Sequence, residues 1–153
     1  MSKIKIVSGR ELHGLANRIT RQMANDFNRA KSIPDKLSFN VAFTLFTGDR
    51  IMCFDEGIVF ARAPLRGMAT IAQQGEQHDG QPTIVGVYVR LANRGKGFGS
   101  ILLEAAVRRC LERGFDNIRV DAISRGGKRL IEKLPEELLA YLDVHDLSRF
   151  SLF

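Results

Sequence analysis

The sequence is short of the features that mark secreted, membrane-spanning and metal-binding proteins. Its two cysteines, Cys53 and Cys110, sit in apolar patterns without metal-ligand spacing, so free buried thiols are expected rather than a disulfide or a zinc site. No apolar run approaches the roughly 18 to 20 residues that span a bilayer. Residues 1–5 lack the apolar segment of a signal peptide. We therefore expect a cytoplasmic protein with no metal and no membrane partner.

Linkers, repeats and low-complexity segments are also lacking. With 153 residues, 44% of them hydrophobic and 26% charged, the chain has the length and composition of one ordinary globular domain over residues 1–153. The formal net charge of +6 favours anionic partners, such as cofactor phosphates, acidic substrates or nucleic acid. The charge alone does not choose among them.

The most informative segment is a glycine-rich turn between two patterned runs. An apolar run over residues 83–89 is followed by Gly95, Gly97 and Gly99 and then by a helical pattern that ends at Gly114. Glycines let successive backbone amides point at one group, and a helix that begins there adds its own amides and the positive end of its dipole. A strand, turn and helix of this kind are suited to bind a diphosphate, with Arg94 and Lys96 adding positive charge.

The spacing of the turn distinguishes it from other phosphate-binding loops. Neither the dinucleotide-binding loop nor the P-loop has its full set of glycines here. The pattern that fits is Arg-x-x-Gly-x-Gly, formed by Arg94, Gly97 and Gly99. In this turn, with its flanking strand and helix, the chain resembles the GNAT superfamily of acyl-CoA-dependent N-acyltransferases, whose corresponding turn binds the pyrophosphate of coenzyme A. The alternative is a glycine-rich connection that binds no ligand.

The resemblance implies a fold and a set of cofactor-binding residues. The fold is α/β, a mixed central sheet flanked by helices, in which two parallel strands splay apart to admit the pantetheine arm. Backbone groups of the strand before the turn, the turn itself, and a serine at the family's asparagine position would bind acyl-CoA. The expected cofactor-binding residues are Val87, Val89, Arg94, Gly95, Lys96, Gly97, Phe98, Gly99, Ser100 and Ser124.

Other elements are predicted from local patterns. Residues 37–47 are ambiguous between strand and helix. Before the glycine-rich turn, the predictions are a strand over 3–7, a helix over 8–29 that begins at a Ser-x-x-Glu capping box, a β-hairpin with strands 51–54 and 58–61, and an exposed loop over 73–81. After the turn, they are a helix with a Glu104–Arg108 pair and a cap at Gly114, a strand over 118–123, and a short helix over 128–134.

The catalytic residues are the part of the resemblance that is incomplete. Many members of the family use a glutamate on the strand before the turn and a tyrosine on the helix after the second strand, and Gly86 and Ile131 occupy these positions here. Three explanations stay open: water carries the protons, another side chain substitutes, or the protein binds acyl-CoA without turnover. Tyr141 is the candidate replacement acid, although its neighbours also suit a plain packing residue.

The function predicted by the resemblance is an N-acyltransferase, with acetyl-CoA as donor and an amine as acceptor. The acceptor is open among small amines, protein amino groups and aminoacyl-tRNA, and a homodimer is compatible with the sequence. A non-catalytic acyl-CoA-binding regulatory or interaction protein is the alternative. Nucleic-acid binding through arginines such as Arg18 and Arg21 is a weaker reading, because clustered aromatics for base stacking are lacking.

Overall fold

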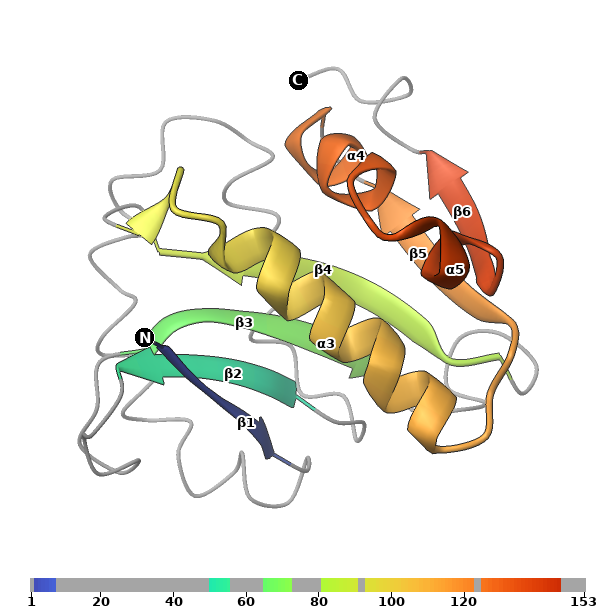
Figure 1. The fold of residues 1–153 in the computed structure, drawn as a ribbon, viewed down its shortest axis with the longest axis horizontal. Helices are drawn as coiled ribbons and strands as arrows, with labels where there is room; N and C mark the ends of the chain where they lie inside the picture. The colour runs from blue at the N-terminus through green and yellow to red at the C-terminus, as the bar shows by residue number, and fades with distance from the viewer. Residues whose placement is uncertain are drawn as a thin grey trace.

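The computed structural model describes residues 2–7, 50–55, 65–72, 81–90, 93–122 and 125–146. Six strands in this part of the chain form one sheet in sequence order (Figure 1). The first four strands are antiparallel, whereas β4, β5 and β6 run parallel to one another. Their bounds are β1 Ser2–Val7, β2 Arg50–Asp55, β3 Leu65–Ala72, β4 Thr83–Val89, β5 Ile118–Ala122 and β6 Leu142–Asp146.

Within the described residues, three helices cover one face of this sheet. Helix α3 (Phe98–Glu112) lies across β3 and β4, while α4 (Arg125–Glu132) and α5 (Glu136–Leu139) lie over β5 and β6 (Figure 1). The mixed sheet with flanking helices confirms the predicted fold class. The core between the helices and the sheet is made of Ala69, Ile71, Ile84, Leu102, Leu103, Ala106, Val107, Cys110, Ile118, Val120, Ala122, Ile131, Leu134 and Leu138.

Helix α3 has the stop signal that its sequence predicts. The amide of Gly114 donates to the carbonyl of Leu111 at 2.9 Å, and the amide of Phe115 donates to the carbonyl of Cys110 at 3.1 Å. With Gly114 at φ 88°, these two bonds form a Schellman motif, which satisfies carbonyls that the end of the helix leaves unpaired. The predicted pair between Glu104 and Arg108 is also present, at 3.0 Å.

Strand β4 contains one extra residue relative to β3. Thr70 pairs with Gly86, but the next residue of β3, Ile71, pairs with Ile84, so the backbone of Val85 bulges out of the ladder. A bulge shifts the alternation of side chains along a strand. Ile84 therefore lies in the core under α3 together with Val87 and Val89, which pack against that core.

Strands β4 and β5 separate after a short contact. Their register contains Thr83 with Arg119 and Ile84 with Val120. Beyond Ile84, β4 continues through residues 85–89 and β5 continues through residues 121–122, but within the described residues the two strands no longer pair. The predicted splay of the two parallel strands is therefore present.

The pattern-based predictions differ from the structure in three places. Strand β2 pairs with β1 on one edge and β3 on the other, so its partner after the turn is residues 65–72 rather than 58–61. Helix α4 begins at Arg125, earlier than predicted, and the chain then forms α5 and β6, which the patterns did not indicate. The predictions for residues 8–49 and the serine at 124 lie outside the described residues.

No helix within the described ranges is long and apolar enough to cross a membrane.

Candidate functional site

A cleft of about 490 Å³ opens where β4 and β5 separate. This volume lies within the range of about 300–1,000 Å³ that is usual for small-molecule sites. The cleft receives residues from β4, the glycine-rich turn, the first turns of α3, the end of β5, and α4. These elements meet at the carboxyl ends of two parallel strands, where open α/β sheets usually bind their ligands.

The glycine-rich turn adopts a backbone that few residues other than glycine accept. Gly95 has φ 77° and Gly97 has φ 87°, both in the left-handed region. Gly97 is the N-cap of α3, so the free amides of the first helical turn begin at Phe98. A Cβ placed on Gly95 or Gly97 would meet no atom within 4 Å. The space in front of the turn is therefore open for a ligand.

Side chains from three elements hold the turn in place. The Nε of Arg94 donates to the carbonyl of Val89 at 2.9 Å, which ties the turn to the end of β4. The Nη1 of Arg66 on β3 donates to Oδ1 of Asn93 at 2.9 Å, and the same guanidinium lies 5.2 Å from the centre of the Phe98 ring. Charge-assisted hydrogen bonds of this kind fix geometry better than neutral ones.

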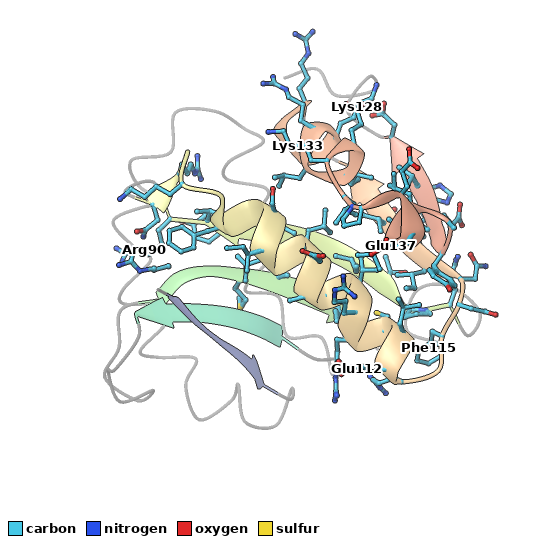
Figure 2. The ribbon with its side chains drawn as sticks, viewed as in Figure 1. Arg90, Glu112, Phe115, Lys128, Lys133 and Glu137 are labelled. Atoms are coloured by element: carbon cyan, nitrogen blue, oxygen red, sulfur yellow. The ribbon has the colours of Figure 1, made fainter. Side chains whose placement is uncertain are left out.

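Helix α4 closes the other side of the cleft. A Cβ on Gly99 would lie 3.0 Å from Cδ1 of Leu130, so glycine allows α4 to approach the start of α3 closely. Gly126 and Gly127 in the first turn of α4 also line the cleft, together with Lys133 just after the helix. Figure 2 shows Lys128 on this helix, Lys133 just after it, and Arg90 near the amino-terminal end of α3.

A polar cluster lies on the opposite face of β5 and β6. The Nε of Arg119 donates to Oδ1 of Asp121 at 2.8 Å, and both side chains are mostly buried. Next to them, Nε2 of Gln81 donates to Oδ2 of Asp143 at 3.1 Å. Nε2 of His145 lies 3.1 Å from Oδ1 of Asp143, close enough for an ion pair when the ring is protonated, although not aligned as a hydrogen bond.

The pKa of Asp143 is lowered from its ordinary value. The hydrogen bond from Gln81 is the largest cause, followed by the contact with His145, and the charge of Arg119 acts in the same direction. Partial burial opposes the shift but does not reverse it. Asp143 is therefore ionised throughout the neutral range, as hydrogen bonds to the charged form of a carboxyl group favour that form.

Most of the residues predicted to bind the cofactor meet in the cleft. Lys96 is exposed in the turn and does not line the cleft, and Ser124 lies outside the described residues. The predicted residues that line the cleft are Val87, Val89, Arg94, Gly95, Gly97, Phe98, Gly99 and Ser100.

The structure does not bring Tyr141, the candidate acid, to the cleft. The carbonyl of Tyr141 accepts a hydrogen bond from the amide of Ile118, at the amino-terminal ends of β5 and β6, and its side chain is 40% exposed. The cleft opens beyond Val120, towards the other end of β5. Gly86 and Ile131, which stand at the family's usual base and acid positions respectively, do line the cleft.

Several residues that line the cleft were not predicted as site residues. Among them are the charged residues Asp121 and Lys133 and the adjacent glycines Gly126 and Gly127. Asp121 could have been noticed, because a polar residue near the carboxyl end of a parallel strand is well placed to face a ligand. The glycine pair had a signal as well, since adjacent glycines at a helix start permit close approach of another group.

The chain matches the model of the acetyltransferase (GNAT) family over residues 21–139. No curated protein sequence gives a significant match.

Several solved structures share the fold at low sequence identity. A ribosomal-protein-alanine N-acetyltransferase from Brucella melitensis biovar Abortus 2308 is 19% identical with a TM-score of 0.54, over 88% of this chain and 91% of that one. Arylalkylamine N-acetyltransferase 2 from Aedes aegypti is 15% identical with a TM-score of 0.55, over 86% and 80%. A predicted acetyltransferase with acetyl-CoA from Clostridium acetobutylicum is 17% identical with a TM-score of 0.50, over 87% and 88%.

Proposed function

Because this chain belongs to the acetyltransferase (GNAT) family, we propose that it transfers the acetyl group of acetyl-CoA to an amine in the cleft between β4 and β5. The observation that carries the proposal is the separation of these strands directly before the glycine-rich turn. An extended arm can lie along residues 85–89 of β4, whose edge towards β5 is released there, while a diphosphate rests on the turn.

The residues of the turn suit a diphosphate. The open space at Gly95 and Gly97 lets phosphate oxygens approach the backbone, and the amides at the start of α3 offer donors on the positive end of the helix dipole. Arg94 and Lys133 add positive charge to the lining of the cleft. The structure of a family neighbour from Clostridium acetobutylicum with acetyl-CoA supports the choice of ligand.

The transfer requires a neutral amine and a path for protons. The amine nitrogen bonds to the acetyl carbon, the carbon–sulfur bond breaks, and the electron pair leaves with the sulfur. Starting from an ammonium, the nitrogen loses two protons, of which one ends on the thiolate and the other in solvent. Gly86 and Ile131 offer no titratable group, so we assign this proton transfer to water, and the protein contributes mainly proximity and orientation.

The experiment combines binding with turnover. Acetyl-CoA binding is measured by calorimetry, and release of free CoA thiol is followed with three acceptors: a peptide with an N-terminal alanine, 2-phenylethylamine, and an aminoacyl-tRNA. We expect binding, and transfer to at least one acceptor. Because water takes the proton, kcat/KM for the amine should rise with pH towards the pKa of that amine, about 10.4 for a lysine-like group.

The second candidate function is acyl-CoA binding without turnover, which is favoured by the lack of titratable groups at positions 86 and 131. Tight binding of acetyl-CoA with no transfer to any of the three acceptors would favour this alternative. Failure to bind acetyl-CoA would contradict both functions.

A further inference from the structure

The cleft is lined by charges of both signs. Arg94 and Lys133 are cationic residues of its lining. Among the described residues that line the cleft, Asp121 is the one that carries a carboxylate. A site lined by both cations and an anion fits two ligand groups of opposite charge better than one polyanion.

Asp121 is placed at the point where the strands separate. Val120 makes the last pair with β4, through Ile84, so Asp121 is the first residue of β5 beyond that pairing. Burial alternates along β5, and the contact between Asp121 and Arg119 puts both on the face away from the three helices. The bulge in β4 turns Gly86 to that same face, and both Gly86 and Asp121 line the cleft.

Strands β5 and β6 carry charges of both signs on this face. The described charged and titratable side chains that these two strands place there are Arg119, Asp121, Asp143 and His145. Two of them are carboxylates and one is a guanidinium. The bond from Arg119 engages Oδ1 of Asp121 at 2.8 Å, and an ionised carboxylate has further lone pairs on its second oxygen.

Building on the proposed acetyl transfer, we propose that Asp121 binds the positively charged amino group of the acceptor, so that the cleft selects cationic amines. The acceptor approaches from the face of the sheet that carries Asp121, and its ammonium donates to the carboxylate beside Gly86. The acetyl donor approaches from the turn and α3. The nitrogen then gives up its protons to solvent and to the departing thiolate, so Asp121 binds and orients the acceptor and need not be the base.

The test measures recognition of charge without relying on turnover. Protein saturated with CoA is titrated with 2-phenylethylamine and with 2-phenylethanol, which has nearly the same shape and no charge. A second pair is a peptide with a free N-terminal alanine and the same peptide with that amine formylated. We expect wild type to prefer the cationic member of at least one pair by about tenfold or more, as a charge-assisted hydrogen bond allows.

The variants test whether the preference for cations depends on Asp121 itself or on the combined charge of this face of the sheet. Asp121→Asn should abolish the preference while leaving the Kd of acetyl-CoA unchanged, because the asparagine oxygen can still accept from Arg119. Asp121→Glu should keep part of the preference. Asp143→Asn is the matched control, since it removes one negative charge from the same face on the neighbouring strand and should keep the preference. Thermal melting verifies that each variant folds.

The outcomes distinguish the two proposals. A wild type without preference in either pair, or an Asp121→Asn variant that retains it, overturns the role of Asp121. An equal loss of the preference in Asp143→Asn also overturns that role, because the preference would then come from the combined charge of the face and not from the carboxylate of Asp121. If acetyl transfer is found, KM for the amine should rise about tenfold in Asp121→Asn with a smaller change in kcat. If transfer is not found but the preference depends on Asp121, acetyl transfer fails and the binding site stands.

Discussion

Two glycines at opposite ends of α3 have the same left-handed φ angle and different surroundings. Gly97 and Gly114 have φ of 87° and 88°, and a Cβ on either would meet nothing within 4 Å. Replacing either glycine therefore costs similar conformational energy, of order 1 kcal/mol. Gly97 faces the cleft, whereas Gly114 caps the far end of the helix. The pair offers a control within one molecule.

We predict that Gly97→Asp weakens acetyl-CoA binding by at least tenfold, about 1.4 kcal/mol, because it places a carboxylate where a phosphate is proposed to bind. Gly97→Asp and Gly114→Asp should lower the melting temperature by similar amounts, but Gly114→Asp should leave the affinity for acetyl-CoA unchanged. Calorimetry and thermal melting of the two variants measure both effects. Equal affinity for acetyl-CoA in the folded Gly97→Asp variant would exclude the turn as the diphosphate site.

A second prediction at this scale concerns Tyr141. Its hydroxyl is removed by Tyr141→Phe, and because the residue lies away from the cleft we expect the rate of acetyl transfer to stay within about twofold of wild type. A positioned proton donor would instead contribute about 10² or more. A loss of that size, with the affinity for acetyl-CoA retained, would restore Tyr141 as the acid and show that the cleft rearranges during the reaction.

At the scale of single residues, the sequence identified the turn better than the acceptor side. Arg94, Gly97 and Gly99 could be read because phosphate binding by backbone amides needs glycines at fixed spacing. The sequence around Asp121 showed only the alternating pattern of a half-buried strand. Its position in the cleft depends on where β4 and β5 stop pairing, which no local pattern records.

Among the elements, β4, α3 and β5 were predictable and β3 and β6 were not. The first three have clear periodicity, a capping glycine and β-branched runs. Strand β3 contains Gly67, and a Cβ on this residue would clash with Leu102 of α3 and with the carbonyl of Tyr88. The packing of α3 on β3 therefore requires a glycine, which weakens the sequence pattern of a strand. Strand β6 alternates weakly, since Asp143 and His145 face one side and Val144 is 45% exposed on the other.

The hydrogen bond between Gln81 and Asp143 joins the segment before β4 to β6, and it predicts a small pH dependence of stability. The pKa of Asp143 is lower in the folded protein than the ordinary value of 3.8. Its stabilising contribution is therefore full above the unfolded pKa and is lost as the pH falls through the folded pKa. Because the side chain is 44% exposed and screened by solvent, we expect less than about 1 kcal/mol.

The measurement is urea unfolding of wild type and Asp143→Asn. The variant should be slightly less stable at pH 7, and the difference should shrink as the pH is lowered below 3.8. A difference that stays constant down to pH 3 would show that the carboxylate charge is not what stabilises this contact.

For the whole molecule, the formal net charge is +6, and several of the described basic side chains lie in ion pairs. Arg108 pairs with Glu104, Lys128 lies 3.2 Å from Asp146, and Arg119 is bonded to Asp121. Paired charges release few counterions on contact with a polyanion, which weakens non-specific nucleic-acid binding. The positive charge is better suited to attract the phosphates of a cofactor over a distance.

We accordingly predict that neither tRNA nor duplex DNA forms a stable complex at about 0.15 M salt, and that any binding at low salt declines steeply as salt is added. Gel shift and calorimetry over a salt series provide the measurement. A tight complex at 0.15 M that is lost on replacing Arg18 and Arg21 by Ala would instead assign a nucleic-acid site to the first part of the chain.

The bulge at Val85 lets β4 hold one extra residue while its paired residues keep the faces that a regular ladder would give them. Removing Val85 would bring the pair Thr70–Gly86 next to the pair Ile71–Ile84 and restore an unbroken ladder with β3. Val87 and Val89 would stay on the helix side, and Gly86 and Tyr88 would stay on the other side. Because Val85 does not line the cleft, a homologue shortened by one residue at this point would keep both the motif and the lining, so the length of β4 is not a strict criterion for recognising active relatives.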